Sequence, residues 1–149
     1  MIKLLAFILV FSPAWSAFAQ DTEPEPDPRV LQPDDVEKLT SVAADLVSKC
    51  KDMQGKKTVV IKDYKNKTDE HIDKKIVIAS MQTSLKEVAR ISTAKSGAKY
   101  PALSLELSAE KNLTGNLQKS TYWLKVKVKV ADDAEACAIE SKFEKTGQL

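Results

Sequence analysis

The stretch 120-STYWLKVKVKVADDAEACAIESKFEK-145 decides the fold, because it contains the clearest strand pattern of the chain. In its first half, apolar side chains alternate with a tryptophan and three lysines: Tyr122, Leu124, Val126, Val128 and Val130 against Trp123, Lys125, Lys127 and Lys129. Strict alternation of this kind predicts a β-strand with one face on a core and the other in water. A second layer is therefore needed to cover the apolar face.

A return strand is expected after a turn at residues 132–134. It places four side chains on the inward face: Cys137, Ile139, Ser141 and Phe143. A loop over 132–135 would bring Lys127 opposite Glu140, and an exposed cross-strand pair of this kind contributes only roughly a few tenths of a kcal/mol. The two halves predict an antiparallel hairpin whose register depends on the length of that loop.

Two further strands precede this hairpin. Leu103, Leu105 and Leu107 alternate with polar residues, which predicts a half-buried strand that ends at the turn over 114–116. The β-branched run over 58–61 predicts a short strand. Because this run is too continuously apolar for a surface strand, we place it in the middle of the sheet.

Two helices are expected to cover the apolar face of the sheet. The first begins at Asp34, which has the spacing of a capping box with Glu37, and ends before Gly55. Its predicted buried stripe is Val36, Leu39, Val42, Ala43, Leu46, Val47, Cys50 and Met53. The second lies within residues 73–91, with Asp73 as N-cap. Its start would also suit a strand, but the longer window has helical spacing, with Val77, Met81, Leu85 and Val88 on the buried side.

Together these elements predict an α+β fold: a two-layer domain with a mixed or antiparallel sheet of about four strands and two main helices on one face. The domain is expected to span residues 34–149 as a single unit. Residues 20–33, QDTEPEPDPRVLQP, are rich in proline and acidic side chains and predict a disordered lead-in.

Residues 1–19 predict export. They have the charged start, apolar middle and A-x-A end of a cleavable signal peptide. No cysteine follows Ala19 to accept a lipid, so we expect a periplasmic protein that is not membrane-anchored. The balance of 23 basic and 21 acidic residues gives no electrostatic case for nucleic acid or an anionic membrane as partner.

The two cysteines, Cys50 and Cys137, are both expected to point into the core. In an exported protein they would form a disulfide, which stabilises by about 4 kcal/mol when it closes so long a loop. The alternative is a pair of inert buried thiols.

The only histidine, His71, lies among carboxylates in 62-KDYKNKTDEHIDKK-75. A metal site needs three or four ligands, and both cysteines are assigned to the core. No elbow such as G-x-S-x-G offers a nucleophile. We therefore predict no enzyme, cofactor or metal; hydrolysis by an unassigned carboxylate pair is the minority alternative. Asn66, Thr68 and Asp73 are expected to hydrogen-bond local backbone groups.

The polar face with Trp123 allows two interpretations. It is either a solvated lysine-rich face with a partly covered indole, or an anchor for a protein partner, because tryptophan is enriched at binding hot spots.

Two parts of the chain resemble the LpoB-type activators of penicillin-binding proteins, which are outer-membrane lipoproteins of Gram-negative bacteria. The run over 58–75, a strand followed by NKTDEHID and a helix, is similar to the family motif N-[KR]-T-x-E-H-I-D. Residues 100–112 and 120–145 are similar to the later strands of the family. The resemblance implies a small α+β domain related to the N-terminal domain of TolB.

The resemblance further implies a non-enzymatic protein that binds a class A penicillin-binding protein and modulates peptidoglycan synthesis. The alternative is a scaffold module of another cell-envelope complex, including a self-associating one; the oligomeric state and the direction of the effect stay open. The residues expected to contact the partner are Asn66, Thr68, Glu70, His71, Trp123, Lys125 and Lys127.

Overall fold

A computed structural model describes residues 25–130 and 135–149. Its elements are α1 (Pro33–Ser48), a 3-10 turn (Lys51–Met53), β1 (Thr58–Asn66), α2 (Lys74–Glu87), β2 (Ser92–Ala94), β3 (Ala102–Thr114), β4 (Leu117–Lys129) and β5 (Glu135–Gln148). The predicted signal peptide and the predicted turn over 132–134 lie outside the described residues, so both remain predictions.

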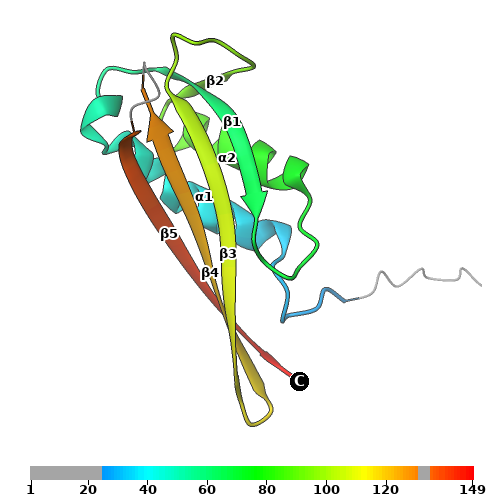
Figure 1. Ribbon diagram of the computed structural model, residues 1–149. Coiled ribbons are helices and arrows are strands. Elements are labelled where there is room, and N and C mark those ends of the chain that lie inside the picture. The colour runs from blue at the N-terminus through cyan, green and yellow to red at the C-terminus, as the bar shows by residue number, and fades with distance from the viewer. Residues whose placement is uncertain (1–24, 131–134) are drawn as a thin grey trace, which may run out of the picture.

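The five strands form one sheet in the order β2-β1-β3-β4-β5. β1 is parallel to β2 and β3, whereas β3, β4 and β5 are antiparallel to one another. Both helices cover the same face of this sheet (Figure 1). The α+β two-layer prediction is confirmed. The sheet has one strand more than expected, which is β2, a segment of three residues directly after the range predicted for the second helix.

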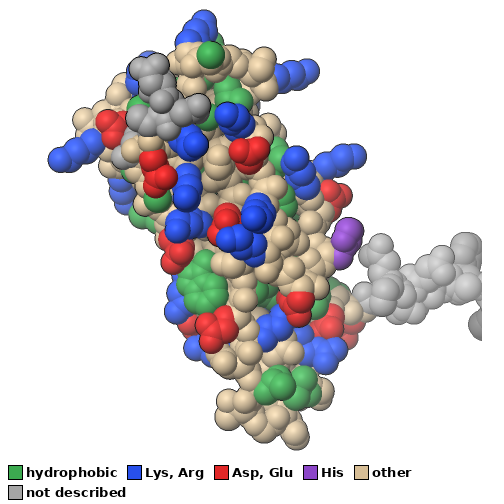
Figure 2. All heavy atoms as spheres, in the orientation of Figure 1, with side chains coloured by type: hydrophobic (Ala, Val, Ile, Leu, Met, Phe, Trp, Pro, Cys, Tyr) green, Lys and Arg blue, Asp and Glu red, His purple; other side chains and the backbone are tan. Residues whose placement is uncertain are grey.

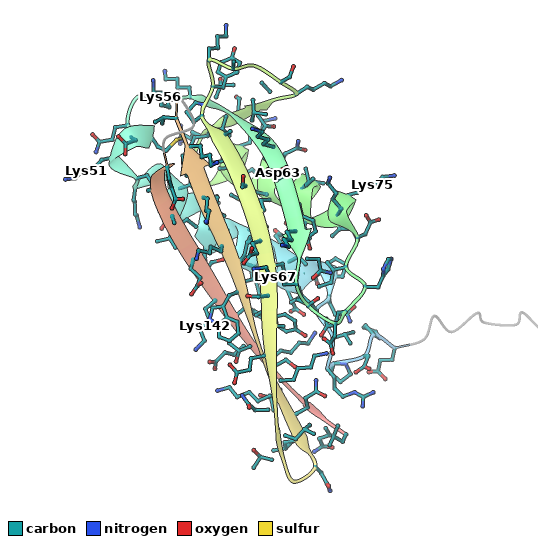
Figure 3. The ribbon with its side chains drawn as sticks, in the orientation of Figure 1. Lys51, Lys56, Asp63, Lys67, Lys75 and Lys142 are labelled. Carbon is teal, nitrogen blue, oxygen red and sulfur yellow. A yellow bond between two sulfur atoms is a disulfide. The ribbon has the colours of Figure 1, made fainter. Side chains whose placement is uncertain are left out.

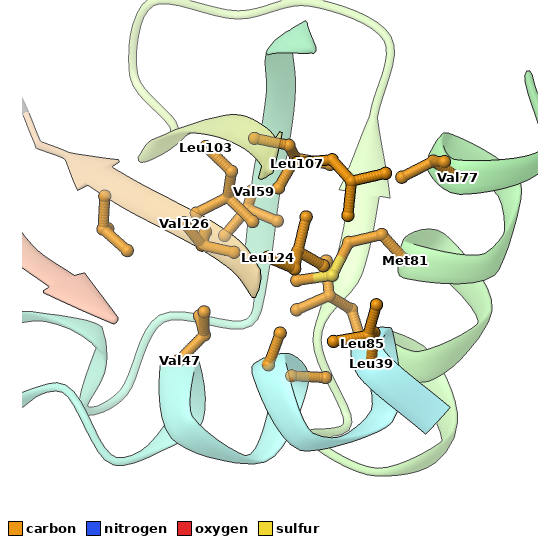
Figure 4. Close-up of a cluster of buried hydrophobic side chains, with 14 of the residues drawn as sticks. Leu39, Val47, Val59, Val77, Met81, Leu85, Leu103, Leu107, Leu124 and Val126 are labelled. Atoms are coloured by element: carbon orange, nitrogen blue, oxygen red, sulfur yellow. The ribbon is translucent and has the colours of Figure 1, made fainter. Parts of the chain in front are cut away.

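The core lies between the helices and the sheet (Figure 4). It is built from apolar side chains of α1, α2 and three strands: Leu39, Val47, Val59, Val77, Met81, Leu85, Leu103, Leu107, Leu124 and Val126 are all buried. Their removal from water is the main favourable term for folding. The apolar residues alternate in β3 and β4 because the helices cover only one face of the sheet. Tyr122 is buried on that covered face, as expected.

The helix ends differ in detail from the prediction. α1 begins at Pro33, with Gln32 as N-cap, and Asp35 rather than Glu37 completes the capping box by accepting a 3.0 Å hydrogen bond from the Gln32 amide. α1 ends at Ser48, and the 3-10 turn that follows keeps Cys50 and Met53 buried. The N-cap Asp73 of α2 is confirmed, since its side chain accepts from the Lys75 amide.

Two valines that we placed in the core are exposed. Val42 is 49% exposed because α1 packs on α2 as well as on the sheet, which turns its buried side toward Thr40 and Ala44. The Thr40 hydroxyl accordingly lies 2.7 Å from that of Ser80 on α2. Val88 is 46% exposed because it is the C-cap of α2, beyond the last helical turn.

Two strands depart from their predicted extent or register. β1 continues to Asn66, and an irregularity between Ile61 and Asp63 switches which side chains face inward. In the β4–β5 hairpin, Glu140 lies opposite Lys125 and not Lys127, so the predicted register is wrong by two residues. The connection runs from residue 130 to residue 134, earlier in the chain than the predicted loop over 132–135, and this moves the register; a second register shift next to the end of β4 offsets part of the difference.

A disulfide joins Cys50 to Cys137, with 6.4 Å between the Cα atoms, which confirms the first of the two alternatives for the cysteines. It links the turn after α1 to the start of β5 and closes a separation of 87 residues. Cross-links over long loops stabilise chiefly by restricting the unfolded chain.

Candidate protein-binding surface

Four of the predicted partner-binding residues lie at the end of β1 and in the loop between β1 and α2, and this segment is held by its own hydrogen bonds. The Asn66 amide group donates to the Glu70 carbonyl oxygen at 2.9 Å. Asn66 Oδ1 in turn accepts from the Thr68 amide at 2.9 Å and from its hydroxyl at 2.7 Å. These polar atoms fix the shape of the loop, as expected of short polar side chains in turns.

Glu70 points inward, and its side chain is only 7% exposed. Its carboxylate accepts hydrogen bonds from the Leu31 amide at 3.0 Å and from the Tyr122 hydroxyl at 2.6 Å, and lies 3.1 Å from Lys111 Nζ. Burial, and secondarily the bond to Glu70, raise the pKa of Tyr122. A buried carboxylate needs such partners, because an unpaired buried charge is very costly.

The residues just before α1 are attached to the domain by Glu70 and by residues of β5. Lys145 Nζ donates to the Val30 carbonyl at 2.8 Å and pairs with Asp35 at 2.6 Å. A Cβ on Gly147 would lie only 2.8 Å from Arg29 Cγ, so the two segments are in close contact. Arg29 also hydrogen-bonds Asp27 and lowers the pKa of that carboxyl to about 2. Within the predicted lead-in, Arg29 and Val30 therefore contact β4 and β5, and Leu31 contacts the loop after β1.

His71, in contrast, is exposed at the surface of the loop. Its neighbour Asp69 pairs with Lys111 at 2.8 Å, and this contact lowers the pKa of Asp69 and raises that of Lys111. Within residues 25–130 and 135–149, no group of three or more His, Cys, Asp and Glu side chains gathers in a way that could hold a metal ion.

The remaining predicted residues, Trp123, Lys125 and Lys127, lie together on the face of β4 that points away from the helices. Trp123 is half-buried and has Ser108 and Lys142 as cross-strand neighbours. Figure 2 shows charged side chains of both signs spread over this outer sheet face. A shallow groove of about 430 Å³ crosses it, lined by Asp63, Tyr64, Lys65, Ser104, Leu105, Glu106, Lys125 and Lys127.

Two charged residues of the outer sheet face were missed by sequence reasoning. Lys67 Nζ lies 2.8 Å from Glu106 and lowers the pKa of that carboxyl (Figure 3). The pairing of β1 with β3 could have indicated them. After the irregularity that follows Ile61, β1 places Lys65 beside Glu106, and Lys67 comes two residues later. The outer sheet face thus joins three strands, and Lys125 and Lys127 are part of its groove.

The fold is that of a small α+β domain with two helices on one face of a five-stranded sheet. A family model described as "Peptidoglycan-synthase activator LpoB" matches residues 36–132, and the chain belongs to this family. No curated protein sequence matches the chain.

A solved structure, the LpoB C-terminal domain from Salmonella enterica, has the same fold. The TM-score is 0.53, the sequence identity is 5%, and the match covers 73% of this chain and 98% of the other. In the part of the chain that the structure describes, no helix has both the length and the apolar character needed to cross a membrane.

Proposed function

We propose that this chain is a periplasmic, non-enzymatic protein that binds a class A penicillin-binding protein and modulates its synthesis of peptidoglycan. The observation that carries the proposal is the match of residues 36–132 to a family of peptidoglycan-synthase activators. The placement of two polar residues of the candidate site supports it as well, because Glu70 is bonded to Tyr122 inside the domain and His71 is exposed.

The contact surface in this proposal is the outer sheet face, with Trp123 as the apolar anchor and Lys125 and Lys127 as the charged groups around it. Half-buried indoles surrounded by polar groups are frequent hot spots. His71 adds an exposed contact on the adjoining loop. Asn66, Thr68 and Glu70 contribute by holding that loop in shape, since their polar atoms bond within the domain.

Modulation requires that the chain bind one state of the synthase more tightly than another. A ligand shifts a conformational equilibrium only by the ratio of its affinities for the two states. A rigid sheet face suits this role, because it loses little conformational freedom on binding.

The test is a crosslinking and activity experiment with the class A penicillin-binding protein of the source organism. The double variant K125E/K127E reverses two charges in the groove and is expected to lower affinity at least tenfold, with a matching loss of the effect on glycan polymerisation. K51E/K86E makes the same change in charge on exposed residues outside the groove and should leave both unchanged.

Two results would contradict the proposal: failure to recover any penicillin-binding protein, or equal binding by both double variants and by W123A. Recovery of a different envelope protein would favour the scaffold alternative instead. Fractionation of cells tests the location, and we expect the protein among the soluble periplasmic proteins.

A further inference from the structure

In the part of the chain that the structure describes, one side of β5 has no strand beside it. β5 is 14 residues long, lies at the end of the sheet and pairs only with β4 among the described strands. Its inner face is covered by α1, where the Ser141 hydroxyl donates to the Leu39 carbonyl at 2.9 Å, but its free side is open (Figure 1). A long open edge presents a row of unpaired backbone groups that can accept another strand.

We propose that this edge pairs with β5 of a second copy of the chain, in antiparallel orientation about a two-fold axis at Ser141. The continuous sheet of the two copies would then have its helices on a common side. A two-fold interface must be self-complementary, because each residue meets its partner twice. The charge pattern of β5 meets this condition when the axis lies at Ser141.

With the axis at Ser141, Glu140 lies opposite Lys142 of the other copy, and Ile139 lies opposite Phe143, each pair occurring twice. An axis at residue 140 or at residue 142 would place like charges opposite each other, which is unfavourable. An axis that lies between two residues would place an inward-facing side chain of one copy opposite an outward-facing side chain of the other. An axis at Phe143 pairs Lys142 with Glu144, but it shortens the paired segment and involves Lys145, which is already bonded to Asp35.

A second observation on α1 points to the same interface. Lys38 Nζ lies 5.4 Å from the centre of the Phe143 ring, so this side of α1 faces the edge strand. One turn further along the helix, Val42 is 49% exposed. A hollow of about 520 Å³ beside it is lined by Asp34, Glu37, Lys38, Ser41 and Val42.

Pairing of the two β5 strands would bring the two α1 helices together on the inner side of the joined sheet. Such a dimer would cover the exposed Val42 on α1 and the half-buried Ile139 and Phe143 on β5. Exposed apolar side chains next to an open edge are typical of surfaces that bind protein. The inference goes beyond the proposed function, because it needs only the purified chain and no synthase.

The first test is the mass of the purified protein in solution, measured by light scattering over a range of concentrations. We expect the weight-average mass to rise from that of the monomer toward twice that value. E140K and K142E should each remain monomeric at concentrations where the parent protein dimerises, because each puts like charges opposite each other.

An equimolar mixture of E140K and K142E should regain the dimer, and so should the double variant E140K/K142E, which also shows that both changes are compatible with folding. E110K is the matched control, since Glu110 is an exposed glutamate on β3, away from the edge, and it should dimerise like the parent.

The second test fixes the register. On mild oxidation, a mixture of E140C and K142C chains should form more linked dimer than either variant alone. A parent chain that stays monomeric at every concentration overturns the inference. So does a dimer that both charge reversals leave intact, or a mixture that fails to restore pairing.

Discussion

The loop after β1 and the outer sheet face carry the same kinds of polar residue but use them differently. In the loop, Asn66, Thr68 and Glu70 direct their polar atoms into hydrogen bonds within the domain. On β4, Lys125 is half-buried and Lys127 is exposed, and Lys127 Nζ lies 3.8 Å from a carboxylate oxygen of Glu135. The loop residues therefore stabilise the fold, whereas the strand residues remain available for a partner.

The difference arises from where the bonding partners come from in the sequence. Glu70 bonds to Leu31, Lys111 and Tyr122, which belong to three separate parts of the chain. The strand lysines have only neighbours on adjacent strands. A charged residue thus becomes structural when the fold brings several distant donors to it, and its own sequence environment does not reveal this.

The largest expected effect is that of Glu70→Ala. The change leaves the Leu31 amide without its acceptor, and the Tyr122 hydroxyl keeps only its longer 3.3 Å bond to the Arg29 carbonyl. Each unsatisfied buried group costs about 1–3 kcal/mol, so we expect the free energy of unfolding to fall by about 3 kcal/mol. Urea denaturation followed by circular dichroism measures this.

Glu87→Ala is the matched control, because Glu87 is an exposed glutamate on the surface of α2. It should change the free energy of unfolding by less than about 0.5 kcal/mol. If the two variants lost similar amounts, Glu70 would not be the centre of a structural cluster.

Much of the fold could be predicted because it depends on local periodicity. Alternating apolar residues predicted β3 and β4, and helical spacing predicted α1 and α2. The disulfide was predicted because Cys50 and Cys137 were both assigned to core-facing positions. The register of the last hairpin could not be predicted, since one irregularity in a strand shifts every pair beyond it. Val42 is exposed because of the way α1 packs against α2, and the sequence of α1 alone contains no information about that packing.

The candidate surface could be predicted in part. The alternation of β4 placed Trp123, Lys125 and Lys127 on one face without knowledge of any other strand. Glu106 and Lys67 were missed because they join that face only through the pairing of β1 with β3. Glu70 was grouped with His71 because they are adjacent in sequence, yet one side chain is buried and the other exposed.

An intermediate effect is expected for Tyr122→Phe, with a dependence on pH. The variant loses the 2.6 Å bond to Glu70, which we expect to cost about 1–2 kcal/mol at neutral pH. The raised pKa of Tyr122 means that the folded state holds this proton more tightly than the unfolded chain does. Stability from this source is complete below about pH 10, where an unfolded tyrosine titrates, and declines as the pH rises further. The variant should therefore lose stability less steeply above pH 10.

Tyr64→Phe is the informative control for this pH dependence. Burial raises the pKa of Tyr64 to about 12, so its removal should also flatten the alkaline decline. Among the described residues, however, its buried hydroxyl has no hydrogen-bond partner, so the neutral-pH stability should not fall. Denaturant titrations at pH 7 and above pH 10 separate the two tyrosines. Equal losses at pH 7 would show that the bond to Glu70 adds nothing.

The smallest effect on stability is expected for Lys125→Ala and Lys127→Ala on the outer sheet face. Exposed charges contribute about 0–1 kcal/mol even when paired, so each variant should stay within about 0.5 kcal/mol of the parent protein in urea denaturation. Because these lysines are expected to matter for the partner, their loss should appear in binding and not in folding. A fall of more than about 1 kcal/mol in either variant would place that lysine with Glu70 among the residues that hold the domain together.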